Sequence, residues 1–281
     1  MSMNISFVKM QGTGNDFIMV DARRLDLDWP ALAIEMCRLH FGVGADGLIL
    51  IQDSKKADLK MRIFNADGSE AQICGNGLRC FAKYAVDRKI VRGPALTVDT
   101  LAGIKKIETT SLRGSVGQAQ VNMGMPELSP DRIPVSVKAR GPVLDHPVKV
   151  AGRELKLSFV SMGNPHAVCF IKQNVDNFPL SDIGPKVEHH KLFPQRTNFE
   201  IVNVVDKNTL KARVWERGVG ETLACGSGAC AVAVASRLKG LTGNSVNILV
   251  RGGKLTITWA GKGDVYLKGP AEEVYEGEYK I

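Results

Sequence analysis

The stretch LKMRIFNADGSEAQICGNGLRCFA, residues 59–82, returns in outline as LKARVWERGVGETLACGSGACAVA, residues 210–233. The two segments lie 151 residues apart and share eight identical positions out of 24. Average composition gives roughly one or two identities by chance over this length. Phe7-Val8-Lys9-Met10 before Gly14-Asn15 is likewise echoed by Phe159-Val160-Ser161-Met162 before Gly163-Asn164. The chain is therefore interpreted as a fused duplication of one structural plan rather than a chance likeness of two βα units.

Each copy shows the same local pattern. Residues 59–64 and 210–215 alternate in polarity as strands do, and glycine-containing loops follow them. Helices are predicted over residues 78–88 and 229–239, and the second is apolar on all sides until Ser236, which is typical of a buried helix. Further strands are predicted over residues 48–51, 96–98, 118–123, 199–205, 246–250, 255–259 and 265–268. The proline-rich segment 126–147 is predicted to cross between the halves.

These elements predict an α/β (α+β) fold of two pseudo-symmetric domains. Each domain is expected to be a curved, largely antiparallel sheet wrapped around one central helix. We expect an N-terminal half over residues 1–124, which carries Cys74, and a C-terminal half over residues 125–269, which carries Cys225.

The composition narrows the function classes. The chain has 281 residues, 44% of them apolar, and a net charge of +8. Its Lys and Arg residues are scattered, whereas nucleic-acid-binding proteins cluster them, so no nucleic-acid partner is expected. No segment approaches the ~18–20 apolar residues of a membrane span, and Met1 to Met10 does not resemble a signal peptide. We expect a cytoplasmic protein without a membrane partner, whose six cysteines stay reduced.

Cys74 and Cys225 occupy equivalent places in the two copies, each before a Gly-x-Gly turn and a predicted helix. The first N–H groups of a helix lack partners and lie at its positive end. A thiol there ionises more easily, and the N–H groups can hold a carboxylate. Inversion at an amino-acid α-carbon needs a base on one face and an acid on the other. The matched pair therefore predicts a cofactor-independent racemase or epimerase, although a single cysteine of this kind is more often a small buried residue.

The other candidate motifs are weaker. Cys37, Cys80, Cys169 and Cys230 have apolar surroundings typical of core thiols. Residues 42–47 match the dinucleotide pattern G-x-G-x-x-G, but they follow a helix-like stretch and precede a strand, the reverse of the required context. His189-His190 has no carboxylate or thiol at metal-binding spacing. We expect neither a metal nor a cofactor.

The chain resembles the diaminopimelate epimerase family along almost its whole length. The segments that carry the resemblance are KMQGTGNDF (9–17), GVGADG (42–47), FNADGS (64–69), CGNGLRC (74–80), GNPH (163–166), RTN (196–198), WERGVGET (215–222) and ACGSGAC (224–230). The resemblance implies interconversion of LL- and meso-2,6-diaminoheptanedioate without pyridoxal phosphate, in lysine and peptidoglycan precursor synthesis. It also implies that the C-terminal strand, residues 270–281, returns to the first half, and that the protein forms a homodimer.

The resemblance also implies site residues. Cys74 and Cys225 match the catalytic thiols, while His166 and Glu216 match residues that assist catalysis. Glu216 is further implied to bind the substrate ammonium group. The other substrate-binding positions implied are Asn15, Asn65, Gly75, Asn76, Asn164, Asn198, Arg217, Gly226 and Ser227. Arg217 suits the distal carboxylate, because a guanidinium grips a carboxylate through two hydrogen bonds.

Taken singly, these residues have plainer explanations. Each Asn suits a turn, Glu216 and Arg217 suit an exposed ion pair, and His166 suits a core histidine. One position departs from the family, because some members use Gln where this chain has Gly47.

Three other functions compete with this one. They are a proline or hydroxyproline racemase, a phenazine-type isomerase without the thiol pair, and a non-catalytic binding protein. Arg217 and the Asn residues favour a longer diacid over proline. The presence of both thiols argues against the other two functions.

Overall fold

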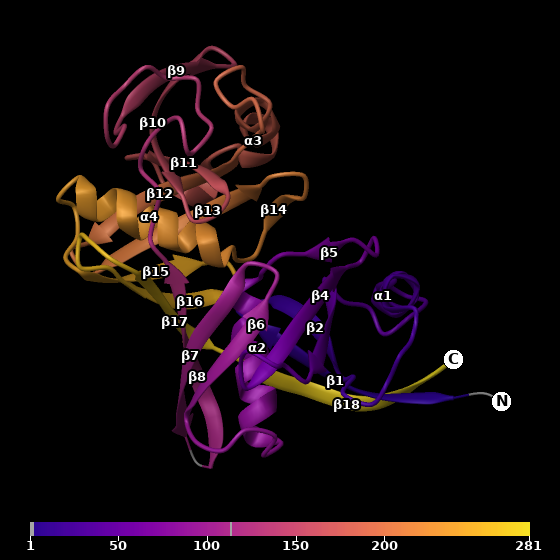
Figure 1. Ribbon diagram of the computed structural model, residues 1–281. Coiled ribbons are helices and arrows are strands. Elements are labelled where there is room, and N and C mark those ends of the chain that lie inside the picture. Colours follow the sequence, from indigo (N-terminus) through magenta and orange to yellow (C-terminus); the bar gives the residue numbers. More distant parts are fainter. Residues whose placement is uncertain (1–2, 113) are drawn as a thin grey trace. The chain divides into compact units, whose positions relative to one another are not determined.

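The computed structural model describes residues 3–112 and 114–281 (Figure 1). The chain divides into two compact units, Met1–Asn122 with Lys268–Ile281, and Met123–Leu267. Both units combine strands with few helices, so the predicted mixed α/β fold class is confirmed. That these units are the two functional halves, divided at 124/125 and 269/270, stays a prediction.

The first unit is built on one continuous set of strand pairings. β1 pairs with β2, β3 with β4, β4 with β5, β6 with β7, and β7 with β8, all antiparallel, whereas β2–β3 and β4–β6 are parallel. The strands are β1 (Asn4–Gly12), β2 (Asn15–Asp21), β3 (Gly47–Gln52), β4 (Leu59–Asn65), β5 (Glu70–Ala71), β6 (Ala95–Thr100), β7 (Gly103–Leu112) and β8 (Ser115–Gly124). The last strand of the chain, β18 (Glu272–Lys280), runs antiparallel beside β1 (Figure 1).

The second unit repeats this order of pairings. β10–β11, β12–β13, β13–β14 and β15–β16 are antiparallel, β11–β12 and β13–β15 are parallel, and β9 adds to β10. The strands are β9 (His146–Val150), β10 (Arg153–Ser161), β11 (Pro165–Phe170), β12 (Asn198–Asp206), β13 (Thr209–Glu216), β14 (Gly220–Thr222), β15 (Ser245–Val250), β16 (Gly253–Thr258) and β17 (Val265–Pro270). Two parallel pairings recur at matching places, which supports a duplicated plan.

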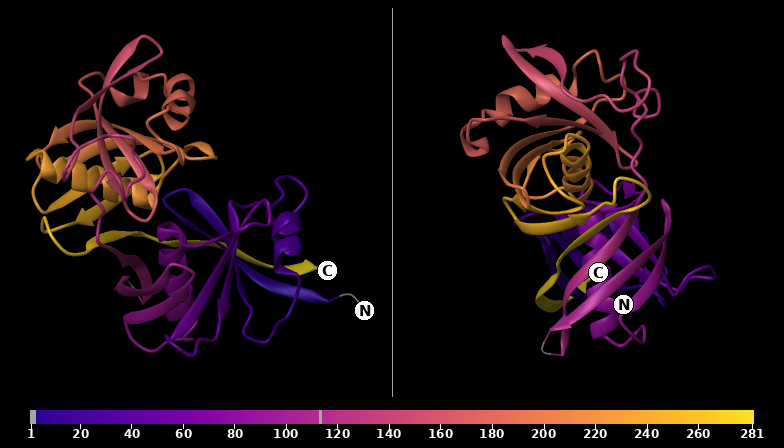
Figure 2. Two further views of the ribbon diagram at one scale, coloured as in Figure 1. Left: turned by 45° about the horizontal axis from the view of Figure 1, so that its top comes forward. Right: turned by 90° about the vertical axis from the view of Figure 1, so that its left-hand side faces the viewer.

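One long helix packs against the sheet in each unit. α2 (Gly75–Asp87) contacts β1, β2, β3 and β7, and α4 (Gly226–Leu238) contacts β10, β11, β12, β13, β15 and β16. The right-hand view of Figure 2 shows α4 nearly end-on, with strands of its unit curving around it. Burial of its Ala and Val side chains is nearly complete, as expected for a helix that is apolar on all sides.

Both helices begin three residues earlier than predicted. The glycine-rich residues 75–77 and 226–228 form the first helical turns instead of preceding them. Glycine is disfavoured in a helix interior, which explains the sequence-based error. Close packing nevertheless requires glycine at both positions. A Cβ on Gly77 would lie 2.8 Å from Ile49, and a Cβ on Gly228 would lie 2.8 Å from Glu200.

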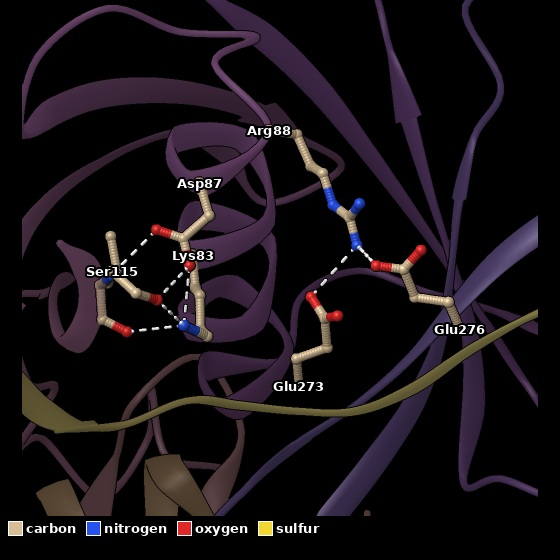
Figure 3. Close-up of polar contacts among 7 residues, drawn as sticks. Lys83, Asp87, Arg88, Ser115, Glu273 and Glu276 are labelled. Atoms are coloured by element: carbon tan, nitrogen blue, oxygen red, sulfur yellow. Dashed lines mark hydrogen bonds and ion pairs between the residues drawn. The ribbon is translucent and has the colours of Figure 1, made fainter.

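The C-terminal end of α2 is held by two polar clusters (Figure 3). Lys83 Nζ donates to Asp87 at 2.7 Å and to Ser115 at 2.6 Å, and the N–H of Val116 donates to Asp87 at 2.9 Å. Arg88 pairs with Glu273 and Glu276 of β18. The end of the helix is thereby attached to two strands.

Along the chain, the remaining helices connect strands that pair in parallel. α1 (Trp29–Cys37) separates β2 from β3, and the 3₁₀ turn Val175–Asn177 and α3 (Leu180–Glu188) separate β11 from β12. The helix-like stretch that was expected before residues 42–47 covered residues 31–40, so α1 overlaps it but begins two residues earlier, whereas α3 was not predicted. Residues 128–145 contain no helix or strand and belong to the second unit, so the predicted crossover over residues 126–147 stays a prediction. Across residues 3–112 and 114–281, none of the helices combines the length and apolar character needed to cross a membrane.

Candidate active site

Cys74 is the N-cap residue of α2. Its backbone is extended, and its Sγ accepts a hydrogen bond from the N–H of Gly77 at 3.4 Å. The thiol is half-buried. Gly75 is buried in the first turn, where the helix leaves its N–H groups without partners from its own backbone. Cys74 thus lies at the positive end of a helix, as the sequence predicted.

Two asparagines lie against Cys74. Asn15 Oδ1 lies 3.5 Å from Cys74 Sγ and accepts a hydrogen bond from Asn76 Nδ2 at 3.2 Å. Asp46 Oδ2 accepts from Asn15 Nδ2 at 2.6 Å, and Arg79 Nη1 donates to Asn76 Oδ1 at 2.8 Å. Both amides are therefore fixed in orientation beside the thiol.

Asn65 and Gly47 behave differently from this group. Asn65 is exposed, and its Nδ2 donates to Ser69 Oγ in the loop after β4 at 2.9 Å, directed at its own loop rather than at Cys74. A Cβ at Gly47 would lie 2.8 Å from the backbone oxygen of Phe64 in the paired strand. A longer side chain at Gly47 would therefore require the backbone to shift.

Cys225 repeats the position of Cys74 in the second unit. It is the N-cap of α4, and its Sγ accepts from the N–H of Gly228 at 3.4 Å and lies 3.4 Å from Ser227 Oγ. Gly226 is buried in the first turn. Only 7% of the Cys225 surface is exposed.

The ionisation of Cys225 differs from the sequence-based expectation. Burial raises the pKa of this thiol well above its usual value, and the nearby carboxylates of Glu216 and Glu200 raise it further. Hydrogen bonds from Ser227 and Gly228 lower it by less. Desolvation therefore outweighs the helix N-terminus, and the resting group is the neutral thiol.

Glu216 lies beside Cys225. Burial raises the pKa of its carboxyl above the usual value, while hydrogen bonds from Thr222 and Cys225 and the charge of His166 lower it. Oε1 of Glu216 accepts from the Thr222 hydroxyl. The buried thiol of Cys225 thus donates a hydrogen bond to the half-buried carboxyl of Glu216.

His166 is fully buried on β11. Its Nδ1 lies 2.7 Å from Glu200 Oε1, and its Nε2 lies 3.0 Å from Asn164 Oδ1. Each ring nitrogen therefore has an oxygen partner, and the two contacts fix the orientation of the ring. His166 therefore links one predicted site residue, Asn164, to a carboxylate that was not predicted.

The side chain of Asn198 is hydrogen-bonded to the backbone of Arg217. Asn198 Oδ1 accepts from the N–H of Arg217 at 2.9 Å, and Asn198 Nδ2 donates to Pro165 at 2.8 Å. The Arg217 side chain is exposed and donates to the backbone of Gln195 at 3.1 Å. Asn198 therefore ties the loop that carries Arg217 to β11.

The sequence reasoning missed Glu200, Thr222 and the buried Arg79. Glu200 was detectable, because it is a lone carboxylate in an apolar run between Phe199 and Ile201. Arg79 was quoted only as part of a motif, although it supports Asn76. Among the residues with described coordinates, no group of His, Cys, Asp and Glu side chains is arranged to hold a metal ion.

The four remaining cysteines are core residues. All are buried, and burial raises the pKa of Cys37 and Cys80 to about 12 and that of Cys169 to about 11. Cys37, Cys80 and Cys169 therefore stay protonated near neutral pH. Only Cys74 and Cys225 combine a thiol with a helix N-terminus.

The family model for diaminopimelate epimerase matches residues 7–129 and 158–274. The chain belongs to the diaminopimelate epimerase family. It is 50% identical to the diaminopimelate epimerase of Acetivibrio thermocellus, over 98% of each chain. It is 48% identical to that of Methanococcus maripaludis, over 99% of this chain and all of the relative. Members of the family are isomerases, and the predicted family is confirmed.

Solved structures of other isomerase and biosynthetic families share the fold. A Bacillus anthracis phenazine biosynthesis protein of the PhzF family aligns with a TM-score of 0.74 and 17% identity, over 99% of this chain and all of that one. A hydroxyproline epimerase from Agrobacterium vitis aligns with a TM-score of 0.72 and 13% identity, over 99% of this chain and 93% of that one. At these identities the likeness concerns the fold alone.

Proposed function

We propose that the protein interconverts LL- and meso-2,6-diaminoheptanedioate, the epimerisation from which its family takes its name, with Cys74 and Cys225 as the two proton carriers. One cysteine, as thiolate, removes the α-proton. The other, as thiol, donates a proton to the opposite face of the planar carbanion. The roles exchange in the reverse direction. Both helix N-termini have to engage the same substrate carbon for this chemistry.

The observation that carries the proposal is the equivalent N-cap position of the two thiols. Each Sγ accepts a 3.4 Å hydrogen bond from the third residue of its helix. The flanking Gly75-Asn76 and Gly226-Ser227 turns are suited to hold the α-carboxylate, because the positive end of a helix attracts an anion. The same turns stabilise the negative charge that develops on that carboxylate in the carbanion.

The surroundings of the thiols suggest separate tasks. Glu216 accepts a hydrogen bond from the Cys225 thiol and is proposed to bind the substrate ammonium group, and Asn15 orients the thiol of Cys74. Asn65, Asn164 and Asn198 are proposed to contact the polar ends of the substrate, and His166 to assist through Asn164. Arg217, with an exposed guanidinium, is proposed to bind the distal carboxylate.

The wider setting is also a proposal. We propose that the reaction proceeds without pyridoxal phosphate or metal, since the two thiols supply both proton transfers. We further propose a cytoplasmic homodimer that serves lysine and peptidoglycan precursor synthesis.

The test is conversion of LL-diaminopimelate by purified protein with dithiothreitol and no added cofactor, followed by chiral chromatography. Appearance of the meso isomer supports the proposal. Conversion of proline or hydroxyproline in its place would assign the protein to a racemase with a different substrate. No conversion of any amino acid would favour a binding function.

A further inference from the structure

We infer that Glu200 is a positioning residue of the Cys225 turn, which holds His166 in one orientation through its buried carboxylate. The inference rests on the proposed function and adds to it a residue that neither the sequence motifs nor the family match singles out. Glu200 lies on β12, between two strands that carry other site residues, β11 with His166 and β13 with Glu216.

The burial of Glu200 requires an explanation. Its side chain is 1% exposed, and an ionised carboxylate in that environment is costly unless it is paired. Oε1 is paired with His166 at 2.7 Å. Among the described residues, none donates a hydrogen bond to Oε2. A purely structural role would favour an apolar side chain here, because a half-satisfied buried carboxylate destabilises the fold.

The local packing makes room for this carboxylate beneath the Cys225 turn. A Cβ on Gly228 would lie 2.8 Å from Glu200 Oε1 and 3.4 Å from Cys225 Sγ. Glu200, Cys225 and Gly228 also line one small cavity, together with Thr222. Glu200 can therefore lie close to the thiol because residue 228, in the first turn of α4, is a glycine.

The contacts of His166 give Glu200 its task. The carboxylate of Glu200 faces Nδ1 of His166 at 2.7 Å and fixes the ring, so that Nε2 points at Asn164 at 3.0 Å. A carboxylate that orients a histidine in this way acts on the reaction without touching the substrate.

The test compares Glu200→Gln and Glu200→Ala with wild-type protein. Glu200→Gln keeps the shape and one acceptor oxygen but removes the charge, so kcat should fall at least about tenfold while KM changes less than about threefold. The activity of Glu200→Ala should be lower still. A kcat of Glu200→Gln within about threefold of wild type would overturn the inference, provided that the wild-type protein is active.

A second readout does not depend on activity. In protein labelled with ¹⁵N-histidine, the Nδ1–H of His166 should give a low-field proton resonance, assigned by its loss in His166→Gln. The resonance should also be lost in Glu200→Ala. Its persistence there would overturn the inference even if the proposed reaction is absent. Glu188→Gln is the matched control, since this second buried carboxylate in the unit accepts from Trp215 and Gly218 and should leave the resonance in place.

Discussion

Arg62 holds Glu70 through two parallel hydrogen bonds, from Nε to Oε1 at 2.8 Å and from Nη2 to Oε2 at 2.9 Å. The equivalent pair 151 residues later, Arg213 and Glu221, has the same two bonds at 2.8 and 3.0 Å. Each pair joins the long strand to the short segment that leads into a cysteine turn. The duplication therefore extends to the side chains that place the two thiols.

The two arginines differ in burial, which predicts different effects on stability. Arg213 is 7% exposed and also donates to the backbone of Val175 and Phe178, whereas the Arg62 pair is open to solvent. Arg62→Ala should lower the free energy of unfolding by at most about 1 kcal/mol. Arg213→Ala should lower it by about 3 kcal/mol, because the buried partners lose their donors. Urea denaturation of both variants measures the difference, and equal losses would contradict this account.

Removal of either N-cap thiol should abolish epimerisation. Cys74→Ala and Cys225→Ala each delete one of two required proton carriers, so activity should fall by at least about a thousandfold with an unchanged circular dichroism spectrum. Cys80→Ala and Cys230→Ala are matched controls on the same helices and should retain activity within a few fold. Substantial turnover by either N-cap variant would rule out the two-thiol assignment.

Gly228→Ala tests the close approach of α4 to Glu200. The added methyl group would lie 2.8 Å from Glu200 Oε1, whose position is fixed by His166. We expect a loss of activity of about tenfold or more and a destabilisation of about 1–3 kcal/mol. At Gly243 a Cβ would meet nothing within 4 Å, so Gly243→Ala should behave as wild type in both assays. Full activity of Gly228→Ala would show that the turn has room to spare.

Arg217→Ala should weaken binding of the diacid selectively. The exposed guanidinium contributes through two hydrogen bonds to a carboxylate, and its loss should raise the Kd of diaminopimelate by about tenfold to a hundredfold. Binding of a monocarboxylate analogue should change much less. Calorimetry with both ligands separates the outcomes, and equal losses would assign Arg217 a structural role in its loop.

Asp87 should make the stability of the first unit depend on pH in the acidic range. Burial alone would raise the pKa of this carboxyl, but hydrogen bonds from Lys83, Ser115 and Val116 lower it overall. Because the folded-state pKa lies below the unfolded value of about 3.9, ionised Asp87 stabilises the fold at pH values above about 3.9. This stabilisation is lost as the pH falls through the folded-state pKa. Asp87→Asn should therefore be less stable than wild type at pH 7, and the gap should narrow at pH 3. A gap that is constant with pH would contradict the assignment.

Much of this structure was accessible from the sequence, for physical reasons. Polarity alternation located β4 and β13, and the 151-residue offset located both thiols, because a duplicated plan repeats its patterns. The helix starts were misplaced, since tertiary packing at Gly77 and Gly228 overrides the low helix propensity of glycine.

The protonation state of Cys225 also could not be predicted from the residues next to it in the sequence. A helix N-terminus favours the thiolate, but burial and two carboxylates from other strands oppose it. Those carboxylates come together only in the folded unit. Glu200 stands out in the sequence as a lone carboxylate in an apolar run, but its partner could not be predicted, because His166 lies 34 residues away.

The most direct test of the two-thiol mechanism is the early time course of the reaction in D₂O. LL-diaminopimelate is incubated with the protein, and the reaction is stopped well before equilibrium. The isomers are then separated, and the deuterium content of each is measured by mass spectrometry. The account predicts one deuterium in each newly formed meso molecule and none in the remaining LL substrate, because the donating thiol carries a solvent proton and the abstracting thiolate faces the other side. Meso product that retains the original hydrogen would mean that a single base moves it across, and would contradict the account.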